Sequence, residues 1–260
     1  MMSTVPPEDE FVHLGYPRGD ALSWKENWYF NFIDRQNHAW GANHISLQRH
    51  KQRGAFMAIH VVDNEVVWYR NEIDLTENFT ELTDGRLSME ILEPHRRHRV
   101  IFRGEKHNLD LIYEARFDVF DYKQHGKGFK DKKSLAIEHY EQGMTLTGTL
   151  TKSGNARPIS GLGHRDHSWG YRDEGNLVGW NWVAAQFPGK TINLSIVHMS
   201  NTENVQSGFI SAAEGNIRVQ EVNIRSTIRD DQNAPITSTY EFRDETSRVW
   251  TITSNRFSSI

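Results

Sequence analysis

The chain has 260 residues, a formal net charge of −4, no cysteine and a mean hydropathy of −0.67. The lack of cysteine excludes disulfide and thiolate chemistry, and the lack of a basic excess argues against nucleic acid as a partner. The first ten residues are polar and acidic, and no apolar run approaches the length of about 18 residues that a membrane span needs. We therefore expect a cytoplasmic protein without a membrane span.

Apolar and polar residues alternate along most of the chain, which is the pattern of half-buried strands. We interpret residues 1–19 as an N-terminal tail. Strands are then predicted over 26–33, 40–49, 56–62, 67–75, 86–92, 98–104, 109–120 and 144–151. The basic run 95–99 is interpreted as a solvated turn, and the Lys-rich segment 121–137 as a long exposed loop with room for a short helix after it.

The segment 152–158 contains a Ser-Gly turn signal and is the predicted joint between two domains, 20–152 and 153–260. Further strands are predicted over 178–187, 191–199, 205–212, 216–228, 236–243 and 247–254. Many short strands separated by turns predict an all-β antiparallel barrel or sandwich. The chain stops directly after a strand, so we expect an incomplete second half, whose open edge would allow an oligomer.

The segment 161–173, Gly-Leu-Gly-His-Arg-Asp-His-Ser-Trp-Gly-Tyr-Arg-Asp, is the densest in side chains that transfer protons. Its three glycines predict sharp bends that aim polar groups at one place. In an extended strand one face carries Arg165, His167, Trp169, Tyr171 and Asp173. Asp166 and Ser168 belong to the other face. His164 and His167 also face apart, which is poor chelating geometry, so we expect no metal site.

These residue types suit chemistry that protonates an alkene, because aromatic faces beside an acid stabilise a carbocation. Trp180 and Trp182 share one face of the following strand and would extend an aromatic wall from Trp169. The segment 139–142, His-Tyr-Glu-Gln, offers a second candidate general acid or base. The alternative interpretation is structural, since Arg–Asp pairs and carboxylate-bound histidines also satisfy corners of β-structure.

The run 165–173, followed by Trp180-Asn-Trp182, resembles the motif of the AttH-like proteins, relatives of the carotenoid 1,2-hydratases (hydroxyneurosporene synthases). Segments 26–32 and 138–142 fit the same group, and the resemblance extends from about residue 20 to about residue 199. It implies two lipocalin-like β-barrel halves of the calycin superfamily. It also implies a cofactor-independent hydratase or cyclase that protonates a hydrophobic, isoprenoid-like small molecule.

The resemblance places His167 and Trp169 at the His-x-Trp of the hydratase site. The Tyr-x-Asp of carotenoid hydratases is missing from 191–199, so a carboxyl elsewhere must supply the acid, and it needs a raised pKa to do so. The catalytic candidates are His167, Asp166, Asp173 and Glu141. The substrate-binding candidates are Trp169, Tyr171, Trp180, Trp182, Tyr140, Arg165 and Arg172. The alternative, which the missing acid favours, is a lipocalin-like protein that binds a hydrophobic ligand without chemistry.

Overall fold

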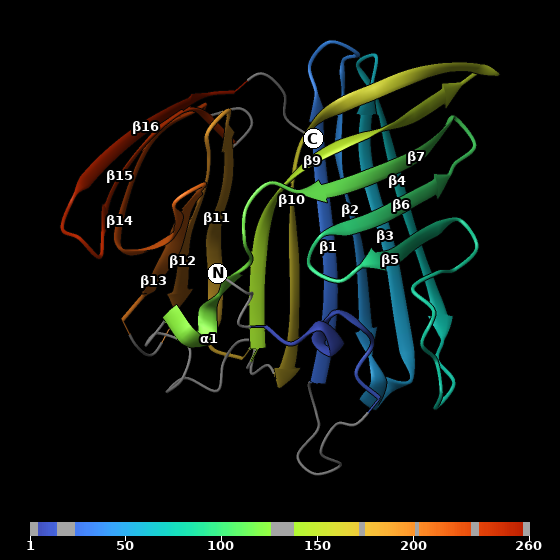
Figure 1. The fold of residues 1–260 in the computed structure, drawn as a ribbon, viewed down its shortest axis with the longest axis horizontal. Coiled ribbons are helices and arrows are strands. Elements are labelled where there is room, and N and C mark those ends of the chain that lie inside the picture. Colours follow the sequence, from blue (N-terminus) through green and yellow to red (C-terminus); the bar gives the residue numbers. More distant parts are fainter. Residues whose placement is uncertain are drawn as a thin grey trace. The chain divides into compact units, whose positions relative to one another are not determined.

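The computed structural model describes residues 5–14, 24–125, 138–171, 175–200, 203–229 and 234–256. These residues form almost only antiparallel β-structure, as the alternating pattern predicted (Figure 1). The chain divides into two compact units, Met1–Glu174 and Gly175–Ile260. Short helical segments of the first unit are η1 (Pro7–Glu10), η2 (Arg49–Lys51) and α1 (Tyr122–His125).

The first unit is built on one antiparallel sheet, drawn from blue through green to yellow in Figure 1. Its strands are β1 (Trp24–Asp34), β2 (Ala39–Gln48), β3 (Arg53–Val62), β4 (Glu65–Asp74), β5 (Leu87–Glu93), β6 (Arg97–Arg103), β7 (His107–Ala115), β8 (Phe120–Asp121), β9 (Glu138–Lys152) and β10 (Asn155–Tyr171). The hydrogen-bonded order is β4-β3-β2-β1-β10-β9-β7-β6-β5, and β8 pairs with β9.

This sheet curls back so that its two edges approach each other. Tyr69 on β4 donates a 2.5 Å hydrogen bond to Asp84, which precedes β5, and the Tyr69 ring lies 5.5 Å from that of Phe102 on β6. We call the concave side the inner face and the opposite side the outer face. The inner face carries a buried apolar core that includes Trp28, Phe30, Ile45, Phe56, Phe102, Leu111, Tyr113 and Leu146. Burial of such large side chains is the main stabilising contribution to the fold.

The second unit is a six-stranded antiparallel sheet in which every strand pairs with the next one in sequence. Its strands are β11 (Leu177–Phe187), β12 (Lys190–Met199), β13 (Val205–Ala212), β14 (Gly215–Arg229), β15 (Ala234–Asp244) and β16 (Val249–Asn255). One face of the sheet carries a separate apolar core formed by Ile192, Leu194, Ile196, Ile210, Val219, Val222 and Phe242. The curled sheet of the first unit and the six-stranded sheet of the second unit together confirm the prediction of two antiparallel β halves.

The predicted domain joint at 152–158 is wrong. Ser153 and Gly154, with φ of 51° and 79°, form the turn of a hairpin whose arms are β9 and β10. The two arms pair continuously from Asn155 and Lys152 to Trp169 and Glu138, so β10 belongs to the first sheet. The division falls after Glu174 instead. A Ser-Gly signal marks a tight turn and does not show whether the chain leaves the sheet there.

The bends predicted at the motif glycines are absent at two of the three positions. Gly161 and Gly163 lie within the continuous strand β10. A Cβ at Gly161 would collide with the backbone carbonyl oxygen of Ile33 on β1, so the missing side chain allows two backbones to approach closely. Gly170 alone has a positive φ, 136°, among these three.

The interpretation of residues 1–19 as a tail is wrong for the described part, 5–14. Glu10 in η1 is fully buried, and its carboxylate accepts hydrogen bonds from the backbone of His95 and from His98. The basic run 95–99 is therefore not a simple solvated turn, because both of its histidines are buried against the N-terminal segment. A buried carboxylate costs free energy unless it is paired, and these contacts supply part of the pairing.

The predicted loop 121–137 begins with ordered structure. Asp121 ends β8, and the Tyr122 ring at the start of α1 is buried. The rest of that prediction, 126–137, lies outside the described residues. The position of Tyr122 is fixed by its aromatic ring, which stacks on the His139 ring at 4.3 Å. The prediction of a loop rested on the charged residues of the segment, which do not indicate this contact.

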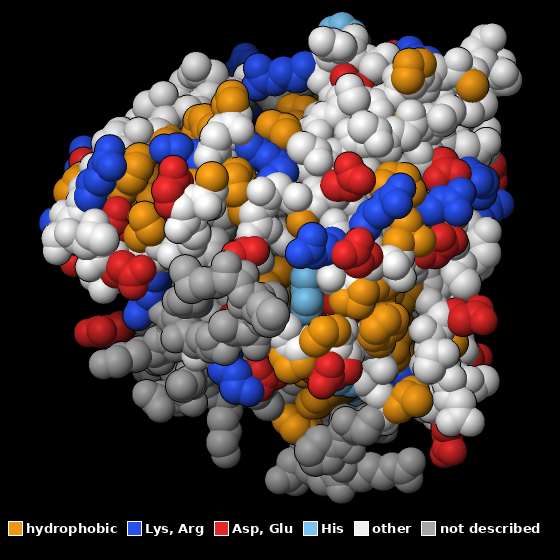
Figure 2. All heavy atoms as spheres, viewed as in Figure 1, with side chains coloured by type: hydrophobic (Ala, Val, Ile, Leu, Met, Phe, Trp, Pro, Cys, Tyr) orange, Lys and Arg blue, Asp and Glu red, His pale blue; other side chains and the backbone are white. Residues whose placement is uncertain are grey.

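Charged side chains of both signs are mixed over the face of the molecule shown in Figure 2. Some of them form surface ion pairs, including Arg53–Glu72, Lys106–Glu65 and Arg99–Asp110. In the part of the chain that the structure describes, none of the helices has the length and apolar character needed to cross a membrane.

Candidate functional site

Strand β10 divides the motif between the two faces of the first sheet. His167 lies beside Trp28 of β1 and Tyr140 of β9 on the inner face. Asp166 lies beside Tyr29 of β1 and Glu141 of β9. The side chains of Asp166 and Glu141 point to the outer face. The alternation that we predicted along this strand is confirmed for the described residues. As a consequence, His167 does not share a site with Asp166 and Glu141.

The outer face carries a polar cluster of His139, Glu141, His164, Asp166 and Tyr122, which we call the outer cluster. His139 Nε2 contacts Asp166 Oδ2 and lies 3.1 Å from Glu141 Oε1. The second oxygen of Glu141 accepts a 2.6 Å hydrogen bond from His164 Nε2, and Tyr122 donates to Oε1 at 3.2 Å. Glu141 and His164 are fully buried, whereas the side chains of His139 and Asp166 are 19% and 17% exposed. The cluster is thus anchored in the protein and open at one end.

Electrostatics hold a proton on His139. Burial by itself would lower the pKa of this imidazole, but the Asp166 charge and the hydrogen bonds to Asp166 and Glu141 outweigh burial and raise the pKa to about 10. Burial would likewise raise the pKa of Glu141, yet its hydrogen bonds from His139 and His164 hold it below its ordinary value. The carboxyl with a raised pKa that the hydratase hypothesis required is therefore not Glu141. In the outer cluster, the group that holds a proton is the imidazole of His139.

We expect the contribution of His139 to stability to fall as the pH rises. Its pKa in the folded protein, about 10, lies above its ordinary value of 6.5, so folding favours the protonated form. That contribution is full below pH 6.5 and is lost as the pH rises through about 10. The measurement is the free energy of unfolding of the wild type and of His139→Gln across this range. The gap between them should shrink with rising pH, and a constant gap would show that His139 is neutral throughout.

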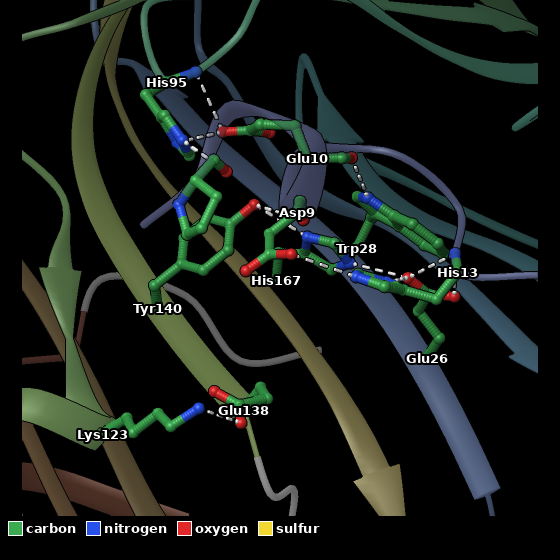
Figure 3. Close-up of polar contacts among 11 residues, drawn as sticks. Asp9, Glu10, His13, Glu26, Trp28, His95, Lys123, Glu138, Tyr140 and His167 are labelled. Atoms are coloured by element: carbon green, nitrogen blue, oxygen red, sulfur yellow. Dashed lines mark hydrogen bonds and ion pairs between the residues drawn. The ribbon is translucent and has the colours of Figure 1, made fainter. Parts of the chain in front are cut away.

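The inner face carries a second cluster, formed by His13, Glu26 and His167, which we call the inner cluster (Figure 3). His13 Nδ1 lies 2.6 Å and His167 Nε2 lies 3.2 Å from the same oxygen, Glu26 Oε1. Glu26 and His167 are fully buried. Aromatic rings enclose the two imidazoles, because His13 stacks on Trp169 at 4.4 Å and His167 stacks on Trp28 at 4.5 Å.

Arg165, one of the substrate-binding candidates, pairs with a carboxylate of the N-terminal segment. Its guanidinium forms two hydrogen bonds with Glu10, of 3.1 and 2.7 Å, and its Nε donates to Gln142 at 2.8 Å. Burial alone would raise the pKa of Glu10, but the charge of Arg165 and hydrogen bonds from His95 and His98 hold it well below its ordinary value. Arg165 therefore anchors the N-terminal segment to β10.

The remaining predicted site residues are distributed as follows. Tyr140 lies on the inner face, where its hydroxyl is 2.8 Å from His167 Nδ1. Tyr171 packs against Trp24 near the end of β10. Trp182 is half-buried on β11 of the second unit, and Trp180 on the same strand is 64% exposed, so its ring is not packed in a core. Arg172 and Asp173 lie outside the described residues.

Four side chains of the two clusters were not named among the predicted site residues: His13, Glu26, His164 and Tyr122. His139 was predicted only as part of the segment 139–142. Glu10, the buried partner of Arg165, was not predicted either. Glu26 and His164 each lie on the same face of the sheet as the residue they contact, but that shared face follows from the pairing of their strands and not from alternation within one strand. His13 and Glu10 carried no alternation signal, since a short N-terminal segment has no strand period.

The profile of a domain of unknown function, DUF7064, matches residues 6–260. The chain belongs to the DUF7064 family. No curated protein matches this DUF7064 chain at a significant level.

Solved structures share the fold of this DUF7064 chain. An AttH-type protein from Nitrosomonas europaea has a TM-score of 0.60 at 14% identity, covering 92% of this chain and 83% of that one. Kievitone hydratase from Nectria haematococca has a TM-score of 0.59 at 14% identity, with coverages of 94% and 80%. CghA, in a structure with Sch210972, gives 0.60 at 11% identity, with coverages of 91% and 79%. The AttH-like resemblance is confirmed at the level of the fold, and the specific relation to carotenoid hydratases stays a prediction.

Proposed function

We propose that this DUF7064 protein is a cofactor-independent hydratase or cyclase that protonates a hydrophobic, isoprenoid-like small molecule, with the outer cluster as its acid–base centre. The observation that carries the proposal is the position of His139 between Asp166 and Glu141. The fold shared with kievitone hydratase supports the reaction class by analogy.

Asp166 is the group that would meet the substrate. Its side chain is partly exposed, whereas Glu141 on the other side of His139 is fully buried. The proton on His139 moves to Asp166 along their hydrogen bond, and the Asp166 carboxyl then donates it to an alkene carbon. The π bond of the substrate breaks, a C–H bond forms, and the adjacent carbon becomes a cation. His139 is left neutral and both carboxylates are left ionised.

The negative charge of the cluster makes this transfer feasible although the pKa of His139 is high. Asp166 and Glu141 hold the proton on His139 in the resting state, and the same field stabilises the carbocation to which the positive charge moves. Tyr29 lies beside Asp166 across the β1–β10 pairing and places an aromatic ring near the cation. The positive charge therefore moves from the His139 ring to a carbon of the substrate and stays close to the two carboxylates.

The fate of the cation decides between the two reactions. In a hydratase, water adds to the cation and gives up one proton to Asp166, which returns it to His139, so the net change is the addition of one water. In a cyclase, a second double bond attacks the cation, and loss of a proton to Asp166 gives an isomer. His164 and Tyr122 position Glu141 in both cases, since each donates a hydrogen bond to it.

The test is incubation of the full chain with a panel of isoprenoid alkenes in D2O, followed by chromatography and mass spectrometry. We expect one or more ligands to return either with the mass of one added water or as an isomer, with deuterium bound to carbon in both cases. Recovery of a bound ligand unchanged and unlabelled would contradict the proposal and favour a lipocalin-like carrier. Absence of both binding and turnover across the panel would contradict the substrate class.

A further inference from the structure

The inner cluster brings together three ligand-type side chains from distant parts of the chain. His13 comes from the N-terminal segment, Glu26 from β1 and His167 from β10 (Figure 3). One ligand atom from each lies within 4.8 Å of the other two. We expected no metal site because His164 and His167 face apart, and they do. The structure instead supplies His167 with partners that no sequence spacing indicates.

One tautomer of His167 directs a nitrogen lone pair at Glu26 and so suits a metal ion between the two side chains. When the Tyr140 hydroxyl donates to the backbone oxygen of Asp9, 3.2 Å away, its oxygen accepts a hydrogen bond from His167 Nδ1 at 2.8 Å. In that tautomer Nε2 presents a lone pair toward Glu26 Oε1, 3.2 Å away. Two acceptors at this distance repel, and a metal ion bound to both of them removes that repulsion.

The second nitrogen of each imidazole has an oxygen partner, as is typical of metal-binding histidines. His167 Nδ1 meets the Tyr140 hydroxyl, and His13 Nε2 lies 3.5 Å from Asp9 Oδ1. Such outer contacts fix the ring orientation and the tautomer that a metal needs. The His13 side chain is 22% exposed, which gives an ion a path from solvent to ligands that are otherwise buried.

We propose that His13, Glu26 and His167 form a binding site for one divalent transition-metal ion of the Zn²⁺ class. Two imidazoles and one carboxylate suit zinc and its neighbours, whereas Ca²⁺ and Mg²⁺ prefer all-oxygen sites. Three protein ligands leave a fourth position for water. The site goes beyond the proposed function, because its ligands are on the opposite face of the sheet from Asp166 and Glu141.

The outer cluster is the less suitable of the two groups. Its three candidate ligands are His139, Glu141 and Asp166, with a single imidazole among them. Both oxygens of Glu141 accept hydrogen bonds from side chains outside that ligand set, one from Tyr122 and one from His164. Glu26 is instead contacted by the side chains of the two other candidate ligands and by the backbone N–H of His13. A metal in the outer cluster would therefore have to displace two additional side-chain hydrogen bonds. The outer cluster therefore serves as the internal control for the experiment.

A metal in the inner cluster would fasten the N-terminal segment to two strands of the sheet. Because a ligand that binds only the folded state stabilises it by mass action, Zn²⁺ at about 100 times its Kd should raise Tm by roughly 5–10 °C. Ca²⁺ and Mg²⁺ should not reproduce this shift.

The experiment is titration of the untagged, chelator-treated full chain with Zn²⁺ by calorimetry, with Co²⁺ as an optical probe of coordination. We expect one ion per chain and a visible Co²⁺ spectrum of low-coordinate, nitrogen-ligated metal. His13→Ala removes a partly exposed ligand and should weaken binding by at least about 100-fold, more than the loss of an outer partner. Tyr140→Phe should weaken it by about 10-fold.

The control variant is Asp166→Asn, which alters the outer cluster and should leave Zn²⁺ affinity and the Co²⁺ spectrum unchanged. Failure of the wild type to bind one equivalent would overturn the proposal, as would equal binding by wild type and His13→Ala. Loss of binding in Asp166→Asn alone would also overturn it and would assign the ion to the outer cluster. These outcomes are independent of whether any alkene is turned over.

Discussion

Replacing Asp166 with Asn should lower turnover of an accepted alkene by roughly 100- to 10,000-fold, the range that a positioned general acid or base contributes. Asn is nearly isosteric with Asp but cannot carry the proton from His139 to the substrate. The pKa of His139 should fall in the same variant, because Asp166 is the largest influence that raises it against burial. The measurements are the initial rate and a ¹⁵N NMR titration of the His139 ring.

The matched control is Asp110→Asn, the same substitution in the same sheet. Asp110 lies on β7, where it forms a surface pair with Arg99, and its variant should keep both the turnover rate and the His139 titration of the wild type. If Asp166→Asn lowered the pKa of His139 but left the rate intact, the outer cluster would be structural. If the rate fell equally in both variants, the loss would reflect general damage to the sheet.

Replacing Arg165 with Met should lower the free energy of unfolding by about 3–5 kcal/mol, the cost of breaking a buried ion pair from one side. Arg165 and Glu10 are both almost fully buried, and two hydrogen bonds join them. Without the guanidinium, the Glu10 carboxylate loses the largest influence that lowers its pKa, so that pKa should rise. The measurement is urea unfolding followed by circular dichroism and Trp fluorescence, whose transitions should coincide.

Arg99→Met is the comparison for Arg165→Met. Arg99 also forms a two-bond pair, with Asp110 at 2.8 Å for each bond, but its side chain is 36% exposed. Its loss should cost no more than about 1 kcal/mol. Adding Glu10→Gln to Arg165→Met should restore part of the lost stability, because no charge is then left buried alone. Equal costs for the two arginines would show that burial of the Glu10 pair has no energetic consequence.

Part of the candidate site could be predicted from local sequence. The alternation along 161–171 placed Asp166 opposite to His167, and it placed His164 and His167 on different faces. The structure confirms both placements. Of the catalytic candidates, Asp166 and Glu141 lie on the outer face and His167 lies on the inner face. Asp166 and His167 are separated because neighbouring residues of a strand point to opposite faces.

The sequence by itself determined the β class, most strand positions and the face that each strand residue occupies, because these depend on a two-residue period within one strand. Only the tertiary structure decided which side chains meet. Arg165 contacts Glu10, and His167 contacts Glu26, across separations of 155 and 141 residues. These contacts depend on strand order, on register and on where the N-terminal segment packs. Those features follow from burying a common core, which no local pattern of residues specifies.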